Sequence, residues 1–161
     1  MKIDEIDLSI LQALQQNSRL SLRELGKQIN LSPPSVAERV RQLESFGVIK
    51  GYTIDIDYEK LHLPVSCFIE VTMKNGDHER FKRFISQYPY ALFCERIAGQ
   101  ACFITKLQLP HLHVLEQFIN EITPYAKTIS HIALSHVEMA PALLSHLKDE
   151  KCLKPNESGP I

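Results

Sequence analysis

A short stretch of the chain, residues 32–42, combines side chains that can hydrogen-bond base edges with side chains that can bind phosphate. If this stretch is a helix in the major groove of DNA, its N-terminal turns present their side chains to the bases. The candidate base contacts are then Pro34, Ser35, Glu38 and Arg39. Ser32 would lie at the positive end of the helix dipole, where it and the neighbouring backbone N–H groups suit a phosphate.

Basic residues gather around this stretch, although the chain of 161 residues has a formal net charge of only -1. Between residues 18 and 50 there are six basic side chains and three acidic ones, a local excess of three positive charges. Such a field suits DNA, because phosphate neutralisation and counterion release supply most sequence-independent affinity. Arg19 and Arg41 are therefore candidate DNA contacts. The alternatives are that Arg39 forms an ion pair with Glu38 or Glu44, and that Arg41 only aids solubility.

Three amphipathic helices are predicted in the first 46 residues. The first, from about Asp4 to Asn17, carries apolar residues at three- and four-residue steps. The second begins at a capping box of Ser21 and Glu24 and ends at Asn30, a residue type that tolerates the left-handed conformation. Its predicted buried side chains are Leu22, Leu25 and Ile29.

The third helix has its own start and stop signals. Ser32 is the predicted N-cap, Pro33 suits the first helical position, and Gly47 supplies the stop. Two short helices separated by three or four residues, the second with a polar face, are typical of a helix-turn-helix. Residues 1–50 are therefore predicted to form a (winged) helix-turn-helix DNA-binding domain, and residues 51–64 an extended strand and hinge.

A second domain is predicted over residues 65–140, in the order strand, helix, strand, strand, helix, strand. The alternating segment from Val65 to Met73 predicts the first strand, and Asp77 and Pro89 bound the first helix. Strands over 91–98 and 101–109 flank Gly99-Gln100, which suits a two-residue hairpin turn. The second helix is predicted from an apolar stripe and the last strand from alternation over residues 128–137; the stripe is Leu112, Leu115, Ile119 and Ile122.

This order predicts an α+β chain whose second domain is ferredoxin-like, with helices on one face of an antiparallel sheet. Phe68 lies on the opposite face, so that face is predicted to pack on a second subunit. Residues 141–161 are predicted to form a tail with a helical turn near Pro141, then a disordered end.

Composition and motifs exclude several classes of protein. No apolar stretch approaches the roughly 18 residues of a membrane span, and the N-terminus lacks a signal-type apolar region. We therefore expect a cytoplasmic protein with no membrane partner. Its cysteines are expected to be reduced because no C-x-x-C spacing accompanies them. They are Cys67, Cys94, Cys102 and Cys152.

Signatures of catalysis and of metal binding are missing. Glycine-rich phosphate loops, H-E-x-x-H and G-x-S-x-G do not occur. The pairs His111/His113 and His131/His136 lack the spacing of a zinc site. We therefore predict no catalytic residue, no metal and no cofactor. An enzyme, or a regulatory subunit of one, built on the ferredoxin-like domain stays an alternative that no motif supports.

The N-terminal residues form a run that resembles the Lrp/AsnC (feast/famine) family of transcription regulators, and in particular its LrpC-like branch. The run comprises Asp4-x-x-Asp7-x-x-Ile10-Leu11, Arg19-Leu20-Ser21, Glu24-Leu25, Leu31-Ser32, Val36-x-x-Arg39-Val40-x-x-Leu43-Glu44 and Gly47-Val48-Ile49 with Gly51-Tyr52. The second domain resembles the family's ligand-sensing and assembly domain. The resemblance spans about residues 1–138.

That resemblance implies a regulator that binds paired sites on double-stranded DNA and forms a homodimer through its sheet domains. Rings of dimers, most often octamers, are the usual further assembly. An amino-acid effector would bind near Gly99, Gln100, Ala101 and Cys102. Cys102 stands where the family's common form has an aspartate, so a carboxylate that could bind the effector's ammonium group is missing.

A second reading within the same class is an architectural protein that wraps or bends DNA with little sequence specificity. Short protected operators in a footprint would indicate the regulator, and long phased protection would indicate the architectural protein.

Overall fold

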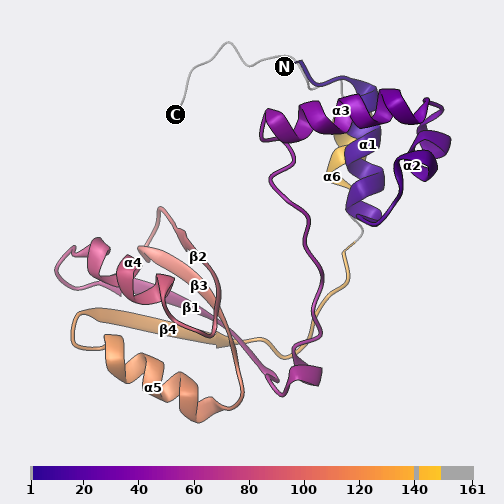
Figure 1. The fold of residues 1–161 in the computed structure, drawn as a ribbon. Coiled ribbons are helices and arrows are strands. Elements are labelled where there is room, and N and C mark those ends of the chain that lie inside the picture. Colours follow the sequence, from indigo (N-terminus) through magenta and orange to yellow (C-terminus); the bar gives the residue numbers. More distant parts are fainter. Residues whose placement is uncertain (1, 140–141, 150–161) are drawn as a thin grey trace. The chain divides into compact units, whose positions relative to one another are not determined.

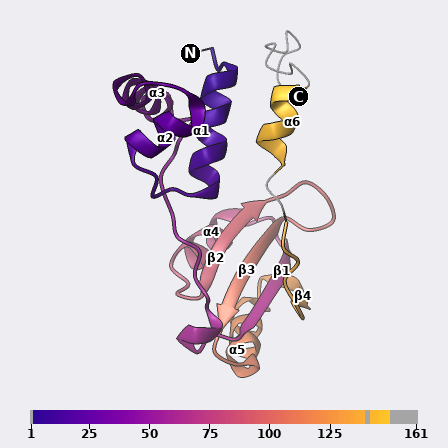
Figure 2. The same ribbon diagram turned by 90° about the vertical axis from the view of Figure 1, so that its right-hand side faces the viewer.

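The computed structural model describes residues 2–139 and 142–149. The chain divides into two compact units. The first comprises the chain up to Asp55 and the described residues from Glu138 onward, and the second is Ile56–Val137. Figures 1 and 2 show the elements of each unit in two perpendicular views.

The first unit holds the three predicted helices and a fourth from the C-terminal end of the chain. They are α1 (Glu5–Gln16), α2 (Leu22–Ile29), α3 (Pro33–Ser45) and α6 (Leu143–Asp149). A side chain caps the N-terminus of each of the first three helices: Asp4 for α1, Ser21 for α2 and Ser32 for α3. Capping boxes begin α1 and α2, and the first two positions of α3 are prolines. Local side-chain chemistry thus sets where each of these helices begins.

The turn between α2 and α3 is tight. Asn30 adopts the left-handed conformation, with φ 58°, as the sequence predicts. The backbone N–H of Leu31 donates to the carbonyl of Gly26 over 2.9 Å. A Cβ on Gly26 would lie 2.6 Å from the Leu31 carbonyl oxygen, closer than atoms of that kind approach. Glycine at position 26 therefore permits the turn that sets α3 against α2, a requirement that the sequence analysis missed.

The core of this unit lies between α1, α2 and α3. Its buried members are Ile10, Ala13, Leu25, Val36 and Leu43. The prediction that Leu22 is buried is wrong, because its exposed fraction is 43%. Leu22 is the first residue of α2 and lies at the open end of the helix. In the described chain between α3 and β1 there is no strand, so the suggested wing is absent.

The second unit contains a four-stranded antiparallel sheet in the order β2-β3-β1-β4. The strands are β1 (Val65–Met73), β2 (Ala91–Arg96), β3 (Phe103–Leu109) and β4 (Ala126–Ile132). Two helices, α4 (His78–Ser86) and α5 (Leu112–Ile122), lie on one face, and the 3-10 turn Glu59–Leu61 precedes β1. The α+β class and the ferredoxin-like order are confirmed.

The helix-covered face of the sheet is the core of this unit. Cys67, Ile69 and Val71 alternate along β1 and are fully buried, as are Phe81 of α4 and Phe118 of α5. The sequence analysis placed Leu112 in the α5 stripe and missed Phe118. Leu112 is 54% exposed, because it is the first residue of α5 and the buried face begins one turn later.

The end of β4 and the turn between β2 and β3 differ from the predictions, because backbone pairing between strands sets both. β4 ends at Ile132 rather than at Val137, because Ile132 is already opposite Cys67 and β1 begins only two residues earlier. The turn at Gly99-Gln100 is wider than a two-residue hairpin. The N–H of Ile97 donates to the carbonyl of Cys102 over 3.0 Å, so residues 98–101 form the loop.

Three smaller points concern the ends and the cysteines. α4 ends at Ser86, before the predicted stop at Pro89. Within the described chain Cys67, Cys94 and Cys102 are free thiols, and burial raises the pKa of the first two. Cys152 and the predicted disordered end lie outside the described residues. None of the described helices has the length and apolar character needed to cross a membrane.

Candidate nucleic-acid interface

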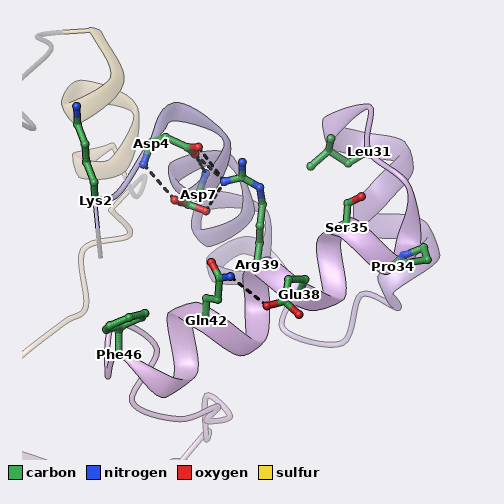
Figure 3. Close-up of a pocket in the computed structure, with 10 residues that line it drawn as sticks. All are labelled: Lys2, Asp4, Asp7, Leu31, Pro34, Ser35, Glu38, Arg39, Gln42 and Phe46. Atoms are coloured by element: carbon green, nitrogen blue, oxygen red, sulfur yellow. Dashed lines mark hydrogen bonds and ion pairs between the residues drawn. The ribbon is translucent and has the colours of Figure 1, made fainter.

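The outward side of α3 carries the predicted DNA-reading residues. Pro34, Ser35, Glu38 and Arg41 are exposed, while Val36 and Leu43 on the other side are completely buried. Figure 3 shows Pro34, Ser35 and Glu38 among the side chains that line a surface concavity between α3 and the N-terminal segment. The helix therefore offers a polar face that the core does not use.

The N-terminus of α3 is uncovered and carries no acidic side chain in its first turn. Ser32 accepts a hydrogen bond from the Ser35 N–H over 3.4 Å, and the two hydroxyl oxygens lie 2.8 Å apart. Both serines are exposed. Two hydroxyls at the positive end of a helix dipole form a suitable place for a phosphate oxygen.

Glu38 is already paired within the same face. Its carboxylate accepts hydrogen bonds from the Gln42 amide, over 3.0 Å, and from the Arg41 guanidinium. The side chains of Glu38 and Arg41 are 47% and 73% exposed, so water screens this pair. A ligand can therefore replace these partners at little cost.

Arg39 is directed differently from its neighbours, toward the start of α1 (Figure 3). One terminal nitrogen, Nη1, donates to both carboxylate oxygens of Asp4, over 3.0 and 2.8 Å, and to Asp7 Oδ1 over 2.8 Å. Asp7 is 1% exposed and the Arg39 side chain 29%. Arg39 thus links α3 to the N-terminus of α1.

The same carboxylates form the cap of α1. The Asp7 N–H donates to Asp4 Oδ1 over 2.8 Å, and the Asp4 N–H donates to Asp7 Oδ2 over 3.1 Å. Desolvation opposes ionisation of Asp4, but the Asp7 N–H and Arg39 outweigh it and lower the pKa of Asp4. The hydrogen bonds from Arg39 to Asp4 and Asp7 raise the pKa of the guanidinium.

The ion pair expected for Arg39 involves other residues than Glu38 or Glu44. Glu38 contacts Arg41 and Gln42, and Glu44 accepts from the Tyr52 hydroxyl over 2.9 Å. The sequence analysis assigned Asp4 and Asp7 only to the helix dipole. Two aspartates at capping-box spacing, the second on the apolar side of the helix, were the available signal.

Arg19 lies in the connection between α1 and α2. Its side chain is exposed, and its backbone N–H donates to Asn17 Oδ1 over 3.0 Å. The structure places Arg19 in the same unit as α3, and no described residue forms a hydrogen bond or ion pair with its side chain.

The predicted effector residues lie in the second unit, at the loop between β2 and β3. Ala101 is 6% exposed and Cys102 is half-buried. The Cys102 N–H donates to the Val71 carbonyl over 2.9 Å, and the Thr72 hydroxyl donates to the Gln100 carbonyl over 3.3 Å. The loop is therefore attached to the end of β1.

A helix-turn-helix with a free outward helix, joined to a ferredoxin-like domain, defines a two-domain transcription regulator. The AsnC-type helix-turn-helix domain model matches residues 3–44, and the Lrp/AsnC ligand binding domain model matches residues 66–143. The chain belongs to the Lrp/AsnC family of transcription regulators. The expectation that it is not an enzyme is confirmed by that membership.

Relatives support the same assignment. The HTH-type transcriptional regulator LrpC of Bacillus subtilis is 55% identical over 138 residues, 86% of this chain and 96% of that protein. The solved LrpC structure matches with TM-score 0.83 and 54% identity, covering 87% of this chain and 100% of that one. A Neisseria meningitidis transcriptional regulator solved with L-Met matches with TM-score 0.81 and 26% identity, covering 90% and 99%.

The link from Arg39 to Asp7 predicts a specific loss of stability. Arg39→Ala leaves a buried carboxylate without its cation, so the free energy of unfolding of the first unit should fall by about 2–3 kcal/mol. Arg39→Lys should recover part of the loss. Arg41→Ala, which removes an exposed pair, should change it by less than about 0.5 kcal/mol. Chemical unfolding followed by far-ultraviolet circular dichroism measures all three; equal losses for positions 39 and 41 would contradict the assignment.

Proposed function

We propose that this regulator binds double-stranded DNA with α3 in the major groove. The observation that carries the proposal is the outward face of α3, whose polar side chains are exposed and whose N-terminus is open. A helix held by its apolar side, with serines and a carboxylate on the free side, suits contact with base edges.

The proposed DNA contacts divide by chemistry. Ser35 and Glu38 read base edges, with Pro34 packing beside them, since a hydroxyl accepts or donates and a carboxylate accepts from the cytosine amino group. Ser32 and the first backbone N–H groups of α3 bind a phosphate. Arg19 and Arg41 bind phosphates nearby and add salt-dependent affinity.

Arg39 has a different proposed role, that of a positioning residue. Its Nη1 is already bonded to Asp4 and Asp7 before DNA arrives, which directs the guanidinium toward α1. It orients α3 rather than reading a base.

We further propose that the chain forms a homodimer through the sheet face opposite α4 and α5, and that dimers assemble into a ring, with an octamer as the expected particle. Every strand contributes an apolar side chain to that face, with Ile129 of β4 59% exposed and Phe93 of β2 40% exposed. Polar side chains stand between them, among them the His131–Glu70 pair. The Phe68 and Phe93 rings lie 6.3 Å apart on it. A large exposed apolar face in a water-soluble unit is typical of a subunit interface. Two copies of the helix-turn-helix would then meet paired DNA sites.

The loop at residues 99–102 is the proposed site of a small amino-acid effector. Support comes from the Lrp/AsnC ligand binding domain match and from the relative solved with L-Met. Gly99, Gln100 and Ala101 offer backbone groups to an effector's carboxylate. Cys102 lacks the carboxylate that an aspartate would offer to its ammonium group, so binding here is weaker than an aspartate would allow.

DNA binding is tested by titrating the full-length protein against its own upstream region and against unrelated DNA at several salt concentrations. We expect tighter, salt-sensitive binding to its own region. Glu38→Gln should relax the base preference with little change in salt slope, and Arg41→Ala should weaken binding to both DNAs and lower the slope by about one. Equal binding to both DNAs would favour an architectural protein instead. Binding to neither DNA would overturn the proposed function.

The dimer interface is tested with Ile129→Lys, followed by analytical ultracentrifugation. A lysine at this exposed position of the edge strand β4 should shift the population toward monomers at micromolar concentration. Leu112→Lys is the matched control, because Leu112 is 54% exposed at the start of α5, away from the open face. If both variants keep the mass of the wild type, another surface makes the assembly.

Effector binding is tested by calorimetric titration of L-Met into the wild type, Cys102→Asp and Cys102→Asn. A charge-assisted hydrogen bond contributes about 1.5–3 kcal/mol, so the aspartate should tighten binding about tenfold or more. The asparagine has the same shape without the charge and should not. Identical heats of binding in all three proteins would place the effector elsewhere.

A further inference from the structure

One face of α1 is covered although it does not belong to the core of the helix-turn-helix. Leu8 is only 2% exposed, yet it is not among the residues of that core. Gln12 lies four residues further along, on the same face of the helix. An apolar side chain at Leu8 would meet water unless another element covered this face.

The element that packs beside α1 there is α6, from the C-terminal end of the chain (Figure 1). The Gln12 side-chain amide is used at both ends: its nitrogen donates to Ser145 Oγ over 2.8 Å, and its oxygen accepts from Lys148 Nζ over 2.8 Å. Leu144 and Leu147 are half-buried, on the side of α6 that carries Ser145 and Lys148. The two hydrogen bonds of Gln12 therefore join α6 to α1, and the side of α6 that carries them is partly covered.

Neither family match accounts for this contact. The matches cover residues 3–44 and 66–143, so most of α6 (Leu143–Asp149) lies beyond them.

Because α6 belongs to the C-terminal end of the chain, its contact with α1 affects how the two compact units are connected. The chain passes between its two compact units twice, after Asp55 and again after Val137. Without α6 on α1, only the first passage would join the helix-turn-helix to the sheet domain. With α6 in place, a second covalent connection limits the orientations open to the helix-turn-helix. Fewer orientations raise the effective concentration of one DNA-binding unit when the other is already bound.

We propose that α6 is a brace: it docks on the Leu8 and Gln12 face of α1 and so favours simultaneous binding of two DNA sites. The inference rests on the proposed DNA-binding function. A helix of seven residues is unstable alone, so α6 forms only while docked. Docking and helix formation are therefore one event, and the brace can be released by a single substitution on its buried side.

The test uses two full-length variants with the same chemical change. Leu144→Asp places a charge on the half-buried side of α6, and Leu143→Asp places it at a position that is 69% exposed. Hydrogen exchange over residues 5–16 measures docking. DNA affinity is measured on a duplex that carries one binding site for the protein and on a duplex that carries two such sites.

We expect Leu144→Asp to speed exchange in α1, to weaken binding to the two-site duplex about tenfold, and to change one-site binding less than about twofold. Leu143→Asp should behave as the wild type in all three measurements. Unchanged exchange in Leu144→Asp would show that α6 does not dock in solution. Faster exchange with equal losses on both duplexes would overturn the brace while leaving the DNA-binding function intact. Failure of the wild type to bind either duplex would instead overturn the proposed function and the brace with it.

Discussion

The contact of Arg39 with Asp4 and Asp7 is the interaction on which the DNA-binding surface depends. Asp7 is almost completely buried, so its carboxylate needs a cation and hydrogen-bond donors within reach. Arg39 of α3 supplies both, over 2.8 Å, while the same carboxylates cap α1. One cluster thus satisfies backbone N–H groups at the N-terminus of α1 and fixes the rotation of α3 about its axis. The outward direction of the reading face follows from that rotation.

The outward face of α3 has different energetics. In the free protein the Glu38 carboxylate accepts hydrogen bonds from Arg41 and Gln42. The Glu38 and Arg41 side chains remain exposed to water. Exchanging these partners for DNA groups therefore costs little where the DNA offers a donor to Glu38. Where the DNA offers only acceptors, the Glu38 carboxylate loses its hydrogen-bond donors and faces atoms that also carry partial negative charge. In the proposed complex this asymmetry would give a sequence preference, whereas phosphate contacts alone give none.

The two units bury their surfaces in different ways. The helix-turn-helix encloses its small core between three helices, and α6 packs on α1 as a fourth helix. The sheet domain covers only one face with α4 and α5 and leaves apolar side chains such as Ile129 in water. These exposed side chains support the homodimer proposed above, in which association of two copies would cover that face. The placement of two helix-turn-helix units on DNA would then follow from assembly of the sheet domains.

The sequence by itself determined the features that depend on neighbours within four residues. The Ser21–Glu24 capping box, the Ser32 cap and the left-handed Asn30 are local bonds, and alternation predicted a ferredoxin-like sheet. Tertiary structure decided what depends on distant partners.

The end of β4 depends on where β1 begins, and the partners of Arg39 lie 32 and 35 residues away. The hydrogen bond from Gln12 of α1 to Ser145 of α6 joins residues 133 positions apart. A local pattern indicates that a side chain is apolar or charged. Only the packed chain selects which surface or which opposite charge it meets.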